Sequence, residues 1–306
     1  MSGPVIDGFF EATVRSASPL AFVALGELVA ERSGVVNIGL EGVVACGALA
    51  SFVGAQLAGP EIGFLAGGIA GAIIAALFAL FVLVLRAQQI IAGTAVSMFG
   101  LGLSASLHRA AVVPGQSLHV DMLTPVRIPL LSDLPVVGRA LFAQPVSTYL
   151  LYVLFPLGSW LLYRTVGGIV LRAVGERSAA VEVAGHSPSR KRFMALTTCG
   201  FLAGLGGATL VVAQAGTFSD GISSGRGFIA IAIVALGRWT PHGVVVGSVV
   251  FGGVSALQFV AQSMGWHLPY ELVLAAPYGV TIAALAVFRG ARAAPAALGR
   301  RLDYPG

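Results

Sequence analysis

Long apolar runs, separated by short polar segments, constrain this chain more than any other feature. Residues 62–85 carry no charged side chain, and about 20 apolar residues are enough for an α-helix to cross a bilayer. Only 10% of the 306 residues are charged and 57% are hydrophobic, whereas soluble domains carry roughly 25% charged residues. Backbone groups in lipid must form their hydrogen bonds within the protein. The chain is therefore predicted to be an all-α polytopic membrane protein.

The apolar runs and their helix-start signals predict about eight transmembrane or partly re-entrant helices. Ser18-Pro19 is typical of a helix start, so residues 1–18 are expected to form a separate amphipathic helix at the membrane interface. The helix that follows ends near Gly34 and is short for a full span. The candidate stretches for these segments lie at 19–34, 37–57, 62–85, 88–107, 149–171, 193–213, 228–237, 241–262 and 271–288, and an error in the first or in 228–237 would change the count. The 228–237 piece is also short.

Basic residues orient these segments, because Lys and Arg near span ends are retained in the cytoplasm. The segment 172–192 is the most charged part of the chain and is predicted to be a cytoplasmic loop. Alternating the spans from there places 13 of the 18 basic residues on the cytoplasmic side. This predicts an external N-terminus, an external connection at 108–148, a transmembrane domain over 19–288 and a cytoplasmic tail at 289–306.

The loop 172–192 carries the signals of a small helix. Gly175 is predicted to stop the incoming span, Ser178 to cap a helix over AAVEVA, and Gly185 to end it. Ser187 and Pro188 then start the next span. A rigid helix held between two spans suits docking to a soluble partner. The alternative is an ordinary basic loop whose ends happen to be capped.

Other residues predict how the helices pack and argue against two kinds of site, for nucleic acid and for metal. A repeat of small residues that lets helices pack closely in lipid lies at Gly63, Gly67 and Gly71. Cys46 and Cys199 lie in apolar runs and are predicted to be buried without a disulfide, and Trp239 is expected at a membrane interface. The basic residues are split among several loops and form no single stripe, so nucleic-acid binding is not expected. No metal site is expected, because the histidines lack metal-ligand spacing: His108, His119, His186, His242 and His267.

Three separated segments resemble one family. Residues 31–42, ERSGVVNIGLEG, resemble the signature near the start of permeases in the bacterial ATP-binding cassette (ABC) importer class for branched-chain amino acids, ribose-type sugars and nucleosides. The wording is closest to the nucleoside, or "simple sugar", branch. The 172–192 loop resembles the coupling segment of that family, and residues 224–241, SGRGFIAIAIVALGRWTP, resemble its third landmark.

The resemblance implies a multi-pass permease of the bacterial inner membrane that imports nucleosides by alternating access and is not itself an enzyme. ATP and Mg would bind a cytoplasmic ATP-binding subunit, and this chain has no GxxxxGK[ST] P-loop. The resemblance also implies a second, related permease in a heterodimer and a substrate-binding lipoprotein or periplasmic protein. No catalytic residue and no cofactor are expected in this chain. Coupling to the ATPase is expected through Gly175, Glu176, Arg177, Ser178, Glu182 and Gly185.

Polar side chains within membrane segments are candidates for the substrate pathway, because leaving them in lipid is costly. Asn37 and Glu41 share one helical face. Either they line a cavity that binds ribose hydroxyls or a base edge, or Asn37 caps a broken helix and Glu41 pairs with backbone groups or Arg32. Glu27 and Glu31 are expected to form a network with Arg32 at the cytoplasmic end. Further pathway candidates at the start of a span are Gln88, Gln89, Thr94 and Ser97.

Other functions remain as alternatives. One alternative is an ABC permease of this class that carries a simple sugar or a branched-chain amino acid in place of a nucleoside. A secondary transporter independent of an ATPase would need internal inverted repeats and midplane carboxylates, of which only Glu41 is a candidate. An intramembrane enzyme would need a paired catalytic constellation within the spans, and none is evident.

Overall fold

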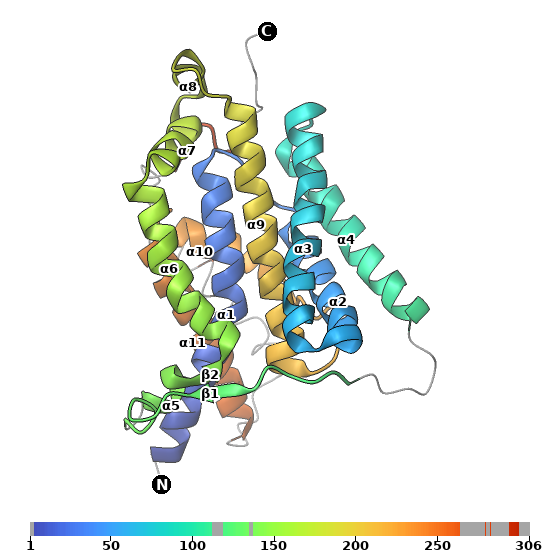
Figure 1. The fold of residues 1–306 in the computed structure, drawn as a ribbon, viewed down its shortest axis with the longest axis vertical. Helices are drawn as coiled ribbons and strands as arrows, with labels where there is room; N and C mark the ends of the chain where they lie inside the picture. The colour runs from blue at the N-terminus through green and yellow to red at the C-terminus, as the bar shows by residue number, and fades with distance from the viewer. Residues whose placement is uncertain are drawn as a thin grey trace.

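The computed structural model describes residues 3–111, 119–134 and 137–263, together with 279, 282 and 294–299. Most of these residues form helices that run along the long axis of the molecule (Figure 1). Six described helical segments are long and apolar enough to cross a membrane, which confirms the polytopic helical class. The predicted span at 271–288 and the tail at 289–306 fall largely outside the described residues.

The helices and strands have clear bounds. Helices α3 and α9 each continue without interruption into a π-helix, η1 and η2. In chain order the elements are α1 (Gly3–Arg32), α2 (Leu40–Ala58), α3 (Pro60–Ala79), η1 (Leu80–Val84), α4 (Gln89–Ala111), β1 (Pro125–Arg127), α5 (Gly138–Phe142), β2 (Ala143–Pro145), α6 (Val146–Arg164), α7 (Val166–Glu176), α8 (Ser178–Val183), α9 (Pro188–Leu210), η2 (Val211–Ala215), α10 (Arg226–Leu236) and α11 (Pro241–Ser263). The six candidate spans are α1, α2, α3 with η1, α4, α6, and α9 with η2.

Helix α1 runs without a break through Pro19, so the separate helix predicted for residues 1–18 is wrong and the first segment is long enough for a full span. Pro19 has no N–H for the carbonyl of Arg15, four residues earlier. The side chain of Gln214 supplies the missing donor, with 2.6 Å between its Nε2 and the Arg15 oxygen. The first half of α1 also packs on α11, where a Cβ on Gly252 would lie 2.7 Å from the Thr13 carbonyl oxygen.

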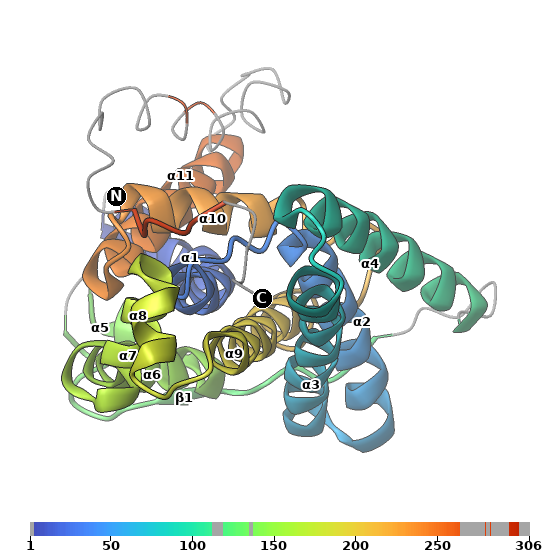
Figure 2. The same ribbon diagram turned by 90° about the horizontal axis from the view of Figure 1, so that it is seen from above.

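Helix α9 lies at the centre of the bundle, between α1 and α3 (Figure 2). Glycines bring α2, α3 and α9 into backbone contact. A Cβ on Gly67 would lie 2.7 Å from the Gly47 carbonyl oxygen, and one on Gly71 would lie 2.7 Å from the Cα of Gly204. These distances confirm that the glycine repeat allows close helix packing. Both cysteines are buried and free, as the apolar runs predict.

The described part of the connection between α4 and α6 lies at the same end of the bundle as the N-terminus of α1, opposite α8 (Figure 1). Its strands β1 and β2 pair antiparallel, a small exception to the all-α prediction. The segment before β1 docks on η2 and its C-terminal glycine. Val120 N lies 2.8 Å from the Gly216 oxygen, and Leu123 N lies 2.7 Å from the Val212 oxygen. These bonds satisfy carbonyl groups at the end of η2.

The single span predicted at 149–171 is wrong, because the chain breaks after Arg164. Thr165 is extended, with φ −104° and ψ 152°, and its Oγ1 accepts a hydrogen bond from the Gly168 N–H at 3.2 Å. This cap starts α7 in a new direction. A Cβ on Gly168 would collide with the Leu161 and Leu162 carbonyls, so the tight turn requires glycine. The segment at the α8 end of the bundle, predicted to begin at residue 172, therefore begins with α7 at Val166.

Helix α10 is short, as the sequence predicts, and the chain reverses directly into α11. Arg238 and Trp239 take positive φ values of 53° and 55° at this reversal. Thr240 caps α11 through a 3.1 Å bond from the Gly243 N–H to its Oγ1, which confirms the predicted helix start before Pro241.

Candidate functional site

Glu41, in the first turn of α2, caps the N-terminus of the half-length helix α10. Its Oε1 accepts the Gly225 N–H at 2.7 Å, and its Oε2 accepts the Gly227 N–H at 2.8 Å. A Cβ on Gly227 would lie 2.7 Å from the Cα of Glu41, so only glycine permits this approach. The buried carboxylate satisfies two orphan donors and complements the positive end of the helix dipole. Glu41 thus pairs with backbone groups, as the structural alternative predicts, while its place in the substrate pathway stays a prediction.

The other predicted pathway residues divide into buried and exposed groups. Gln89 and Ser97 bind the segment that leads into α2, through the Val36 N–H at 3.1 Å and the Ile38 carbonyl at 3.0 Å. Asn37 does not cap α2; its Oδ1 accepts the Gly39 N–H at 3.0 Å, just before the helix. Their polar atoms therefore serve internal contacts, although the Asn37 Nδ2 has no bond among the described residues. The exposed members are Gln88 and Thr94.

A buried acidic network lies at the C-terminal end of α1. The Glu27 carboxylate accepts the Asn37 N–H at 2.9 Å, and Glu31 accepts the indole N–H of Trp239. Arg32 donates from Nε to the Trp239 carbonyl at 2.8 Å. The predicted network is present, but Trp239 is its hub, and Trp239 is buried instead of facing a membrane interface. The network ties α1 to the reversal between α10 and α11.

Arg192 joins three helices beside this network. Among the described residues it is the largest fully buried side chain, 2% exposed, and it donates from Nε to the Ser33 carbonyl at 3.2 Å and from Nη2 to the Val174 carbonyl at 3.4 Å. Gly175 packs against the Arg32 backbone so closely that a Cβ there would collide with it. Arg192 on α9 thus ties the end of α7 to the end of α1.

Helix α8 projects from the end of the bundle beyond this junction (Figure 1). Ser178 is its first residue and does not cap it, since Arg177 occupies the cap position without a side-chain bond. Gly185 ends it with φ 81°, as predicted. Val181 is buried, whereas Val183 is 91% exposed. The predicted coupling residues Glu176, Arg177 and Glu182 are also exposed.

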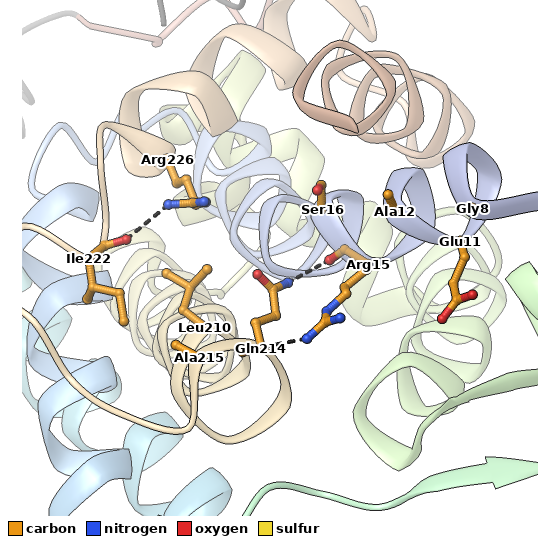
Figure 3. A pocket seen from close by; sticks show the side chains of 10 residues that line it. All are labelled: Gly8, Glu11, Ala12, Arg15, Ser16, Leu210, Gln214, Ala215, Ile222 and Arg226. Carbon is orange, nitrogen blue, oxygen red and sulfur yellow. Dashed lines mark hydrogen bonds between the residues drawn. The ribbon is translucent and has the colours of Figure 1, made fainter. Parts of the chain in front are cut away.

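A cavity with a mixed polar and apolar lining lies at the opposite end of the bundle, between the first half of α1, η2 and the start of α10 (Figure 3). We call it the outer cavity. Its volume is about 560 Å³. Its lining residues are Gly8, Glu11, Ala12, Arg15, Ser16, Leu210, Gln214, Ala215, Ile222 and Arg226.

Two reciprocal bonds close one wall of the outer cavity, and we call them the Arg15–Gln214 clamp. Gln214 Nε2 donates to the Arg15 carbonyl, and Arg15 Nη2 donates to the Gln214 carbonyl at 3.1 Å (Figure 3). The clamp joins the carbonyl released by Pro19 to the last turn of a π-helix. π-Helical turns are frequent at functional sites. The Arg15 carbonyl freed by Pro19 and the π-helix η2 therefore lie at the wall of the same cavity.

The loop from Gly216 to Gly225 is anchored beside the outer cavity by an exposed ion pair. Asp220 Oδ2 lies 3.0 Å from Arg109 Nη2, and its Oδ1 lies 3.4 Å from His108 Nδ1. The Arg109 guanidinium lowers the pKa of Asp220 below its ordinary value of 3.8. The pair fixes the loop to the end of α4.

Sequence reasoning missed Arg192, the outer cavity and the role of Gln214. Glu11 and Arg15 appear in the sequence as the charged face of an interfacial helix, and Arg192 as one of several basic loop residues. The only sequence signal for the clamp is Pro19 in an otherwise helical pattern, because it implies a carbonyl that needs an outside donor.

Comparisons with known proteins identify the family. The family described as "Branched-chain amino acid transport system / permease component" matches residues 9–285. The chain is 35% identical over 301 residues to the guanosine ABC transporter permease protein NupQ of Bacillus subtilis, covering 94% of each chain. It is 33% identical over 293 residues to the nucleoside ABC transporter permease protein NupC of Lactococcus lactis, covering 92% of each. A putative glucose ABC transporter permease protein, TsgC13 of Haloferax volcanii, is 34% identical over 269 residues, covering 88% of this chain and 82% of that protein.

No solved structure was found to match the chain. The family match spans most of the sequence, and the candidate spans agree with a multi-pass protein of the bacterial inner membrane. Permeases of ABC transporters work with an ATP-binding subunit and a substrate-binding protein. The chain therefore belongs to the branched-chain amino acid transport system permease family and is a transmembrane permease subunit of an ABC importer.

Proposed function

We propose that this permease imports nucleosides. The observation that carries the proposal is its identity of 35% and 33%, over more than nine tenths of the chain, to permeases named for guanosine and nucleoside transport. The signature at 31–42 supports the same branch. A simple sugar is the second candidate, because the putative glucose permease TsgC13 is 34% identical to the chain.

The α8 end of the bundle is the docking surface for the ATP-binding subunit in this proposal. Val183 lies on this projecting helix and is 91% exposed, so its side chain is accessible to a partner subunit. Glu176 and Glu182 flank it with charge. Movement of α8 would reach α1 and α9 through Gly175 and Arg192, since both are packed against backbone at the junction.

The proposal extends to the remaining subunits, which the family resemblance implies. ATP and Mg bind in the ATP-binding subunit, and this chain holds no cofactor and no catalytic residue. A second, related permease completes a heterodimer. The substrate-binding lipoprotein or periplasmic protein docks at the opposite end of the bundle, where the connection containing β1 and β2 lies.

Uptake measurements test the substrate. Cells that express this chain with its ATP-binding subunit, second permease and binding protein are given radiolabelled guanosine, adenosine, ribose, glucose or leucine. Nucleoside uptake that disappears with an inactive ATPase is expected. If only ribose, glucose or leucine is taken up, that compound replaces the nucleoside as the proposed substrate. Uptake by this chain without the ATPase would indicate a secondary transporter.

Substitutions in α8 test the docking surface. Val183→Asp places a charge in the proposed contact and should abolish co-purification of the ATP-binding subunit, whereas Val183→Thr keeps the shape and should retain it. The double variant Glu176→Ala, Glu182→Ala should uncouple uptake from ATP hydrolysis while inserting normally in the membrane. Full uptake by both Val183→Asp and the double variant would refute this surface.

A further inference from the structure

The outer cavity has the size and the mixed lining of a small-molecule site. Its volume of about 560 Å³ lies within the roughly 300–1,000 Å³ typical of ligand pockets. Leu210 and Ile222 give it apolar walls, and Glu11, Arg15 and Gln214 give it acceptors and donors (Figure 3). Among the described residues the Glu11 carboxylate forms no hydrogen bond or ion pair, so it is available to a ligand.

The Arg15–Gln214 clamp can exchange partners. Pro19 leaves the Arg15 carbonyl without a donor in its own helix, so that oxygen must bond either to Gln214 or to something that replaces it. Gln214 sits in the last turn of η2, where the regular helix has already ended. Secondary transporters offer a precedent, because they bind substrate at helix interruptions where freed backbone groups line a cavity.

We propose that the outer cavity is a binding subsite for the nucleoside, a proposal that rests on the nucleoside import proposed above. A nucleoside is uncharged and presents flat apolar ring faces together with donors and acceptors on its base and ribose. Glu11 accepts N–H groups of the base, and Arg15 and Gln214 donate to its carbonyl and ring nitrogens, the pairings these side chains make with bases elsewhere. When α1 and η2 separate, the Arg15 carbonyl accepts a hydroxyl or N–H of the ligand in place of Gln214.

Cysteine labelling tests the subsite directly. The only native cysteines, Cys46 and Cys199, are buried and free, so one introduced cysteine gives a clean signal. Ser16→Cys, in the cavity lining, is labelled with a water-soluble thiol reagent in the assembled transporter, with Ala12→Cys as a second cavity position. Gln56→Cys, exposed on α2, is the control. Guanosine should slow labelling of the cavity cysteines and leave the control unchanged, and leucine should slow none.

Uptake kinetics of the complete transporter test the side chains. Gln214→Ala should raise the half-saturation concentration for guanosine about three- to tenfold, as expected for one lost hydrogen bond, and Glu11→Gln should do the same. The matched controls Gln56→Ala and Glu61→Gln, both exposed, should behave as wild type.

The outcomes separate the two proposals. Unchanged labelling of both cavity cysteines by guanosine, in transporters that import guanosine, would overturn the subsite and leave nucleoside import standing. A wild-type half-saturation concentration in both Gln214→Ala and Glu11→Gln would do the same. Failure of the wild-type transporter to import any nucleoside would overturn the proposed function itself, and the subsite with it.

Discussion

Replacing Glu41 with glutamine tests how the half-length helix α10 is held. Both carboxylate oxygens of Glu41 accept backbone N–H groups, at 2.7 Å from Gly225 and 2.8 Å from Gly227. Glutamine keeps one acceptor oxygen, so one amide retains a neutral bond. The other amide then faces the NH₂ group of glutamine, which is a donor and cannot accept it.

The size of the effect follows from these two bonds. Hydrogen bonds to charged groups contribute about 1.5–3 kcal/mol and neutral ones about 0.5–1.5 kcal/mol, so the weakened bond costs about 1 kcal/mol and the lost bond about 2 kcal/mol. The sum of about 3 kcal/mol corresponds to a rise of roughly 100-fold in the local opening equilibrium, at about 1.4 kcal/mol per factor of ten. The opening is local, because α9 and its glycine contacts do not involve Glu41.

Hydrogen–deuterium exchange of the purified protein, followed by mass spectrometry, measures this opening. Peptides that cover residues 222–230 should exchange roughly 100-fold faster in Glu41→Gln, while peptides of α9 should exchange as in wild type. Glu61→Gln, in the exposed first turn of α3, is the matched control. Exchange of 222–230 within about threefold of wild type would refute the cap, since that change corresponds to less than about 1 kcal/mol.

Further predictions concern three other contacts. Asp220→Asn should speed proteolysis of the loop at 216–225 at pH 7, because it removes the ion pair with Arg109. In the wild type the folded state lowers the pKa of Asp220. The ion pair therefore stabilises the loop fully above about pH 4, and this stabilisation is lost as the pH falls through the folded-state pKa. Equal rates of proteolysis at pH 7 and pH 3 would contradict this dependence. Gly71→Val should separate α3 from α9, because a Cβ at this position would lie 2.7 Å from the Cα of Gly204. The expected loss of folding stability is about 1–3 kcal/mol, measured as a lower temperature limit for a monodisperse protein. Arg192→Gln should reduce uptake more than ATP hydrolysis, because two buried carbonyls lose their guanidinium partner; equal losses of both activities would argue against a role in transmission.

Local chemistry explains the features that sequence reasoning predicted correctly. Ser187 with Pro188, Thr240 with Pro241, and Gly185 mark helix ends where the structure has them, because a cap depends on residues within one turn. The break at Thr165 was missed, although its cap is equally local. The apolar residues of α6 and α7 suggest one continuous span, whereas the change of direction depends on the Thr165 cap together with the close packing of Gly168 against the preceding turn.

The sequence by itself determined the class of the protein: its apolar runs require membrane-spanning helices, its glycine spacing requires close helix packing, and three ordered motifs indicate an ABC permease. Only the tertiary structure decided how the interruptions in those helices are resolved. Glu41 caps a helix 184 residues away, and Gln214 completes the hydrogen bonding that Pro19 breaks in α1, 199 residues from the Arg15 carbonyl it binds. A carbonyl or N–H left unpaired in lipid must find a partner, but the sequence near it does not say which distant segment supplies that partner.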